Sequence, residues 1–291
     1  MSERIILDGG MGRELWRRGI EVPGTIWSAN ALLVAPDTVQ QIHEDYIAAG
    51  ADIITLNNYS LVPDALAAAG LEHRLDGLLA EALVLARRAR EGAARPGIRI
   101  AAALPPLANS YRADLVRPFD IAYPVYRRIA ASLASGVDLF VCETMASAAE
   151  ARAAALAGVE TGLPVWVSWS LHDDTSGRLR SGESVAEAIA AVRDLPIDAF
   201  LFNCSTPESI GAALPALRRL TDRSIGAYAN AFRPVPGDWD MARDGLLALR
   251  DDISPAVYAA IVEQWERCGA TIFGGCCGIG PDHITCLARR V

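Results

Sequence analysis

Cysteines are the residues of this sequence best suited to chemistry. Cys276 and Cys277 are adjacent within a Gly-Gly-Cys-Cys-Gly string, and Cys204 follows an apolar run earlier in the chain. Adjacent cysteines rarely bridge each other, because a vicinal disulfide is strained. Thiolates favour soft metal ions such as zinc, and three protein ligands leave a fourth position open for a substrate. We therefore predict a catalytic zinc (Zn2+) site at these three cysteines, provided that the fold brings them together.

The elements that must position these cysteines alternate along the chain. Short apolar runs are separated by amphipathic stretches such as Leu78–Arg90, which is the pattern of βαβ units and a parallel sheet. Eight strands in 291 residues favour a closed barrel, and no Gly-x-Gly-x-x-Gly follows the first strand as it would in a dinucleotide-binding sheet. The prediction is an α/β fold, a single (β/α)8 TIM barrel, with one domain over residues 1–291. The predicted strands are Arg4–Asp8, Asp52–Asn57, Ile98–Leu104, Asp138–Glu143, Pro164–Ser170, Ala199–Cys204, Ser224–Asn230 and Ala270–Cys276.

Strand ends are where such a barrel keeps its functional residues. Cys204 ends the predicted sixth strand and Cys276 the eighth, and only one strand separates them, so one ion is within reach of both. The flanking glycines allow the sharp turn that brings the Cys277 sulfur to the same ion. The other three cysteines are interpreted as small buried hydrophobic residues. They are Cys142, Cys268 and Cys286.

Composition excludes several classes of partner. The net charge of −8 and the lack of a basic stripe argue against nucleic acid. No apolar run is long enough for a membrane span, and the N-terminus lacks a basic and then apolar secretion signal. We expect a cytoplasmic protein whose partners are small molecules.

Five segments of the chain together resemble the homocysteine S-methyltransferase family, and the resemblance covers essentially the whole length. The segments are Asp-Gly-Gly-Met-Gly-Arg-Glu-Leu at 8–15, Ala-Gly-Ala-Asp-Ile-Ile-Thr-Leu-Asn-Asn-Tyr at 49–59, Glu-Thr at 143–144, Asn-Cys at 203–204 and Gly-Gly-Cys-Cys-Gly-Ile-Gly-Pro-Asp-His-Ile at 274–284.

That resemblance implies a role for each matching residue. Cys204, Cys276 and Cys277 would hold zinc, and no catalytic residue is expected beyond the zinc site. Asp8 and Glu143 would face the amino group of the acceptor. Backbone N–H groups of Gly9 and Gly10 would lie nearby. The remaining expected substrate-binding residues, lining the same pocket, are Asn57, Tyr59, Asn203 and Asn230.

The implied reaction is methylation of the homocysteine thiol to give methionine. A free thiol is mostly protonated at neutral pH, whereas a zinc-bound thiol is a thiolate. The methyl donor would be a small sulfonium, S-methylmethionine or S-adenosylmethionine, since a chain of this length resembles the S-methylmethionine-using members. Aromatic faces attract such cations. The candidate aromatic residues are Tyr59, Trp166, Trp169, Tyr228, Phe232 and Trp239.

Two departures from the family pattern lie near the expected pocket. Arg13 replaces a small hydroxyl residue, and the seventh strand ends in Tyr-Ala-Asn-Ala-Phe at 228–232. The long connection that follows, to about Ile253, is predicted to form a lid or a substrate wall. Betaine or another onium donor, and another thiol or a selenol acceptor, remain alternatives. A non-catalytic zinc-binding barrel and a redox pair at Cys276 and Cys277 are the alternatives from other classes.

Overall fold

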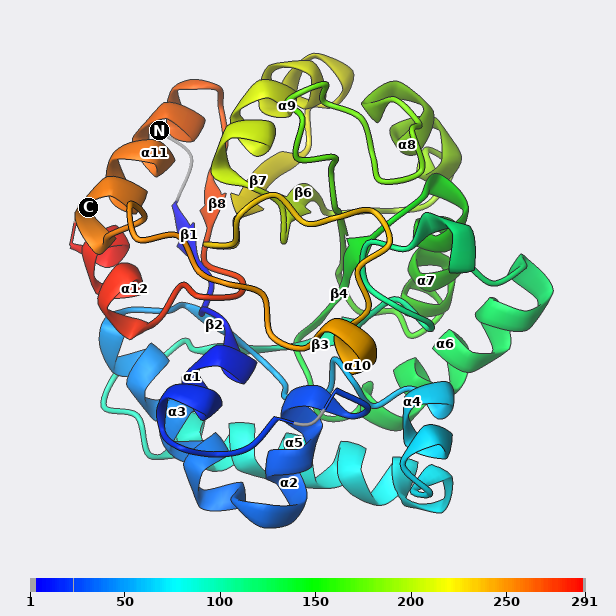
Figure 1. Cartoon of the computed structure of the whole chain (residues 1–291), viewed down its shortest axis with the longest axis vertical. Coiled ribbons are helices and arrows are strands. Elements are labelled where there is room, and N and C mark those ends of the chain that lie inside the picture. The colour runs from blue at the N-terminus through cyan, green and yellow to red at the C-terminus, as the bar shows by residue number, and fades with distance from the viewer. Residues whose placement is uncertain (1–3, 23, 290–291) are drawn as a thin grey trace.

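Eight parallel strands form a closed ring at the centre of the computed structural model, which describes residues 4–22 and 24–289 (Figure 1). Neighbouring strands pair in the order β1-β8-β7-β6-β5-β4-β3-β2. A parallel bridge between Leu7 and Ile53 closes the ring between β1 and β2. The strands are β1 (Ile5–Ile6), β2 (Ile53–Thr55), β3 (Arg99–Leu104), β4 (Leu139–Met145), β5 (Val165–Trp169), β6 (Ala199–Asn203), β7 (Ser224–Tyr228) and β8 (Ile272–Phe273).

Helices surround this ring on the outside, so the predicted (β/α)8 TIM barrel is confirmed. The ends of the predicted domain 1–291, together with residue 23, lie outside the described residues. None of the helices described is long and apolar enough to cross a membrane. The α-helices are α1 (Met11–Arg17), α2 (Ala31–Val34), α3 (Pro36–Ala49), α4 (Pro63–Ala68), α5 (Leu75–Glu91), α6 (Phe119–Leu133), α7 (Ala148–Val159), α8 (Val185–Val192), α9 (Pro207–Leu220), α10 (Met241–Asp244), α11 (Pro255–Arg267) and α12 (Pro281–Ala288). Short 3-10 helices are η1 (Trp27–Asn30), η2 (Glu72–Arg74) and η3 (Ala113–Leu115).

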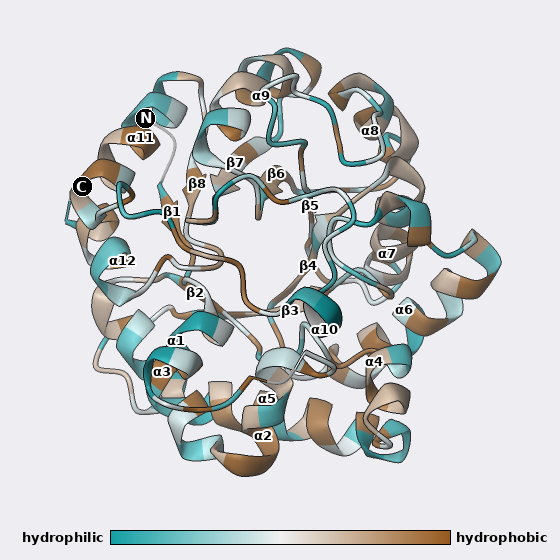
Figure 2. Cartoon of the chain, viewed as in Figure 1, coloured by the Kyte–Doolittle hydropathy of each residue, from teal (hydrophilic) through white to brown (hydrophobic). Residues whose placement is uncertain are grey.

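Two apolar layers hold the barrel together, because side chains alternate across each strand. On β4, Leu139 and Val141 belong to the cluster inside the ring, whereas Phe140 and Cys142 pack between the sheet and the helices. Figure 2 shows hydrophilic and hydrophobic segments alternating along the surrounding helices. Cys142 is fully buried in the outer layer, as predicted, whereas Cys268 and Cys286 are only partly buried and pack against that layer.

Seven of the eight described strands are shorter than predicted, β1, β2 and β8 most of all, whereas β4 runs two residues beyond its predicted end. The last strand was expected to reach Cys276, but regular pairing ends at Phe273. A Cβ on Gly274 would lie 2.5 Å from the Cβ of Leu7, so only glycine lets the chain pass so close to the first strand at this point. The barrel therefore ends early at β8 and frees the following residues to turn toward the central axis.

His43 is an unusual member of the outer layer. Its side chain is completely buried on α3, and neither ring nitrogen has a hydrogen-bond partner. Burial lowers the pKa of His43 from 6.5 to about 4, because the imidazolium form would lose its hydration. Between these two pH values the unfolded chain binds more protons than the folded one, so this group destabilises the protein as the pH falls.

Replacing His43 by leucine should therefore reduce the loss of stability in acid. The parent loses unfolding free energy between pH 8 and pH 5 because of His43. Given the pKa of about 4, the variant should lose about 2 kcal/mol less than the parent over this range. Denaturant titrations at the two pH values would measure it, with the same change at exposed His73 as the control. An equal shift in both variants would contradict the assignment to His43.

Candidate metal centre and substrate cavity

The three predicted metal ligands meet at the C-terminal end of the barrel. Cys204 directly follows β6, and Cys276 and Cys277 follow β8. Their Sγ atoms all lie within 4.8 Å of one another, with 2.7 Å between those of Cys204 and Cys276, and all three are free thiols. The end of β7, which lies between β6 and β8, holds both cysteine-bearing segments. The Cys204 N–H donates to the carbonyl of Tyr228, and the Cys276 N–H donates to that of Ala229. The cysteines are thus brought together by the backbone of the barrel.

Backbone conformation at these cysteines is unusual. Cys204 has a φ of +49°, in the left-handed region, where a residue with a Cβ is destabilised by about 1–2 kcal/mol. Gly278 also lies in this region, and a Cβ on Gly275 would approach the side chain of Ile279 to 2.2 Å. Strain of this kind persists where surrounding structure imposes it and is concentrated at functional sites.

The donor set fits a soft metal ion. Sulfur atoms that share one zinc at about 2.3 Å lie about 3.8 Å apart in a tetrahedron, a separation within the 4.8 Å spread of this cluster, although the Cys204–Cys276 distance is shorter. Hydrogen bonds from Cys276 and Cys277 lower the pKa of Cys204, and the same bonds to Cys204 raise the pKa of each of the other two thiols. Because three neighbouring thiolates repel one another, all three can ionise together only beside a cation. The cluster can therefore hold a metal.

A cavity of about 460 Å³ opens above the three thiols. Its lining carries four carboxyl groups, those of Asp8, Asp64, Glu143 and Asp240, and no Lys, Arg or His among the described residues. Besides the cysteines, six of the predicted substrate residues lie in its wall. They are Asp8, Gly9, Gly10, Asn57, Tyr59 and Glu143. A cavity with this charge suits ligands that bring positive charge.

Asp8 and Glu143 are the acidic groups nearest the barrel axis. The Asp8 carboxylate accepts hydrogen bonds from the Thr55 N–H at 2.7 Å and its hydroxyl at 3.2 Å, and Glu143 accepts one from the Tyr228 hydroxyl at 3.2 Å. Burial raises the pKa of Asp8 to about 7. Burial, with smaller contributions from Cys204 and Asp8, raises the pKa of Glu143 to about 8. Both carboxyls would ionise more completely beside a bound cation.

A family model described as homocysteine S-methyltransferase matches residues 5–291. The chain belongs to the homocysteine S-methyltransferase family. It is 30% identical to the homocysteine S-methyltransferase of Escherichia coli over 98% of this chain and 94% of the relative. It is also 27% identical to a selenocysteine Se-methyltransferase of Brassica oleracea, over 98% of this chain and 88% of the relative.

Among solved structures, the metallated form of the homocysteine methyltransferase MmuM from Escherichia coli superimposes with a TM-score of 0.84 and 27% identity. The match covers 100% of this chain and 97% of that one. The protein is thus an enzyme of this methyltransferase family, and a cavity of about 460 Å³ is consistent with small-molecule substrates.

The glycines of the first family motif act mainly through their small size. A Cβ on Gly9 would lie 2.2 Å from the Ile279 carbonyl oxygen, and one on Gly10 would lie 2.6 Å from that of Cys276. The Gly10 N–H already donates to Ile279, so it is not available to a substrate. These glycines allow the first turn of the chain to pack directly against the cysteine-bearing turn.

Two predicted substrate residues, Asn203 and Asn230, are not among the residues that line the cavity, and their contact with substrate stays a prediction. Asn203 is fully buried and exchanges hydrogen bonds with Thr144, whose φ is +61°. Asn230 accepts a hydrogen bond from the Phe232 N–H. Both amides hold backbone turns beside the cavity, a role that a motif match does not distinguish from substrate contact.

The aromatic candidates also separate into two groups. Tyr59, Tyr228, Phe232 and Trp239 line the cavity. Trp166 and Trp169 do not: Trp166 packs inside the barrel, and Trp169 faces the helices and stacks on Phe200, so these two are excluded as donor contacts. Two aromatic lining residues escaped the sequence analysis, Trp27 and Tyr111. The only sequence signal for Tyr111 was its place in the connection after the third predicted strand.

The segment of residues 231–253 forms one wall of the cavity, as predicted for the long connection, and Figure 1 shows it crossing above the strand ring. Arg13 of α1 secures this wall. Its guanidinium donates to the Leu247 carbonyl and lies 5.3 Å above the ring of Phe232, while only 9% of Arg13 is exposed. The arginine that departs from the family pattern therefore ties the first helix to the cavity wall.

Replacing Arg13 by methionine should loosen this wall without unfolding the barrel, because the methionine cannot donate to Leu247. We expect faster amide hydrogen exchange in residues 231–253, measured by mass spectrometry. The same change at Arg17, on the same helix but exposed and paired with Glu14, is the matched control. Equal exchange in the two variants would show that Arg13 does not hold the segment.

Proposed function

We propose that this enzyme methylates the thiol of homocysteine, using zinc bound by Cys204, Cys276 and Cys277 and a small sulfonium donor, S-methylmethionine or S-adenosylmethionine. The observation that carries the proposal is the convergence of three thiols below a cavity whose charged lining is entirely acidic. The homocysteine-specific names of its relatives support the choice of acceptor. All six cysteines are free thiols, which accords with a cytoplasmic location.

The three cysteines would supply the metal ligands and leave a further position for the acceptor sulfur. When bound, zinc lowers the pKa of a thiol ligand and keeps its sulfur as a nucleophilic thiolate at neutral pH. No side chain is then needed as a general base, which accords with the absence of His and Lys from the described lining.

Asp8 and Glu143 would bind the ammonium group of the acceptor. Both carboxyls line the same cavity as the thiols, burial raises the pKa of each, and no Lys, Arg or His is among the described lining residues. An arriving ammonium supplies a positive charge and forms charge-assisted hydrogen bonds. These contacts fix one end of the amino acid, so that its other end, the thiol, reaches the cysteines.

The donor would occupy the part of the cavity lined by Tyr59 and Trp239. Aromatic faces and nearby carboxylates stabilise a sulfonium cation without forming a covalent bond to it. Attack of the acceptor thiolate breaks one methyl–sulfonium bond and forms a thioether. The donor leaves as a neutral thioether, and the thiol proton is released to solvent. The walls of the cavity contribute by holding the two sulfur atoms in line with the methyl group.

The decisive experiment offers homocysteine with S-methylmethionine, S-adenosylmethionine or betaine in separate reactions, and measures methionine together with the zinc content. Turnover with a sulfonium and about one zinc per chain would support the proposal. Turnover with betaine alone would refute the donor assignment. Zinc without methionine from any donor would refute the acceptor, and selenocysteine would be the next acceptor to test.

Replacing Cys276 by alanine should remove zinc and activity while the barrel stays folded, because the apolar layers do not depend on the ion. Metal analysis, a turnover assay and circular dichroism would measure the three properties. Cys286→Ala is the control, since that cysteine packs against the outer core and should leave zinc in place. Normal turnover by metal-free Cys276→Ala would disprove the zinc mechanism.

Replacing Glu143 by glutamine should weaken acceptor binding and leave zinc bound. Loss of a charge-assisted hydrogen bond should raise KM for homocysteine about 10–100-fold. Burial raises the pKa of Glu143, so this carboxyl is protonated at a higher pH than an exposed one. KM should therefore rise toward acid, and the variant should lack that part of the dependence. Loss of zinc from Glu143→Gln would instead place this carboxylate at the metal.

A further inference from the structure

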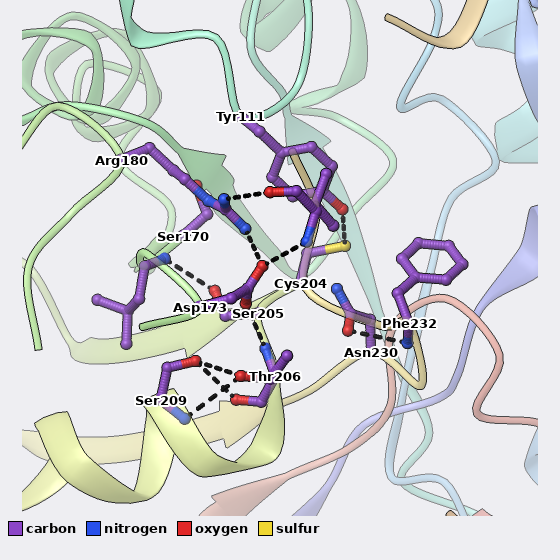
Figure 3. Close-up of polar contacts among 12 residues, drawn as sticks. Tyr111, Ser170, Asp173, Arg180, Cys204, Ser205, Thr206, Ser209, Asn230 and Phe232 are labelled. Atoms are coloured by element: carbon purple, nitrogen blue, oxygen red, sulfur yellow. Dashed lines mark hydrogen bonds and ion pairs between the residues drawn. The ribbon is translucent and has the colours of Figure 1, made fainter. Parts of the chain in front are cut away.

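Tyr111 contacts the metal-binding cluster without being one of its cysteines. Its hydroxyl lies 3.0 Å from the Sγ of Cys204, and both residues are 5% exposed (Figure 3). A phenol is a good hydrogen-bond donor at neutral pH, and a thiolate can only accept. Tyr111 also has a φ of +68°, in the left-handed region, as Cys204 does. Two strained residues therefore meet through one hydrogen bond at the cluster.

An arginine holds the tyrosine ring in place. The guanidinium of Arg180 lies 4.8 Å from the centre of the Tyr111 ring, and the ring of Trp239 packs at 5.8 Å. Arg180 pairs with Asp173 at 2.6 Å, and the two side chains are only 3% and 4% exposed. A buried ion pair of this kind resists separation, because removing one partner leaves the other charge uncompensated.

The same ion pair is attached to the segments on either side of the cluster. Asp173 accepts hydrogen bonds from the backbone N–H of Thr206, two residues after Cys204, and from that of Val235, each at 2.9 Å. Arg180 donates to the Val235 carbonyl at 3.2 Å. One buried pair thereby connects the cysteine-bearing turn after β6, the cavity wall and the ring of Tyr111, as Figure 3 shows for the labelled residues.

We propose that Tyr111 is a positioning residue of the metal centre, holding the Cys204 sulfur through its hydroxyl while the Asp173–Arg180 pair holds its ring. This role rests on the proposed zinc site. A hydrogen bond from a residue that is not itself a metal ligand fixes the orientation of the thiolate and reduces the negative charge on its sulfur. Such hydrogen bonds change the affinity for the metal. If Tyr111 only filled space, its ring would do so without the hydroxyl, and metal binding would not depend on the hydroxyl.

Tyr111→Phe separates these two possibilities, because it keeps the ring and removes the hydroxyl. We expect zinc affinity to fall about 10–100-fold, measured by competition with a chromophoric chelator. The sulfur-to-metal charge-transfer band of the cobalt(II)-substituted protein should also shift. Tyr126→Phe is the matched control: that tyrosine is completely buried on α6, and its hydroxyl has no partner.

Unchanged zinc affinity and an unchanged cobalt spectrum in Tyr111→Phe would overturn the proposal, as would equal effects in Tyr126→Phe. These readouts are independent of turnover. A parent protein that binds zinc but methylates no homocysteine would refute the proposed reaction and leave the test of Tyr111 valid. A parent protein that takes up neither metal would refute the metal centre and this role together.

Discussion

Strand β7 sets the spacing on which the rest of the site depends. Its end accepts a hydrogen bond from each of the two cysteine-bearing segments, through the carbonyls of Tyr228 and Ala229. The sulfurs can meet only because β6, β7 and β8 are consecutive neighbours in a closed parallel sheet. Closure at Leu7 and Ile53 then brings the first strand, with Asp8, to the other side of the same turn. Barrel closure thus assembles residues from both ends of the chain.

Electrostatics explain why this assembly suits its chemistry. Thiols and carboxyls are gathered in one cavity. Arg13 and Arg180, the two buried arginines of the described chain, are bound to the cavity wall and are not among the lining residues. Burial penalises every anion, so Asp8 and Glu143 have raised pKa values in the absence of ligands. A metal ion, an ammonium group and an onium donor all relieve this penalty. The cavity is therefore selective for a set of ligands that each carry positive charge.

Periodicity and motifs predicted the barrel, its eight strands and the meeting of the three thiols, since all of these follow from strand order. They could not separate residues that line the cavity from residues that support it. Asn203 occurs within a family motif, yet its amide is consumed by Thr144 and Ser168. Tyr111 escaped notice because its loop carries no periodic pattern. It contacts Cys204, and its ring packs against Arg180 of a buried ion pair formed by residues 173 and 180, which come from a different connection.

The 231–253 segment is fastened near both of its ends, at Val235 by the Asp173–Arg180 pair and at Leu247 by Arg13. Between these anchors, Trp239 and Asp240 face the cavity. Insertions or substitutions between the anchors can therefore reshape this side of the cavity, where we propose that the donor binds, while the thiol cluster keeps its geometry. During evolution, the reaction can therefore be conserved while the substrate changes. A library of variants restricted to residues 236–246 is the natural place to engineer a new donor preference.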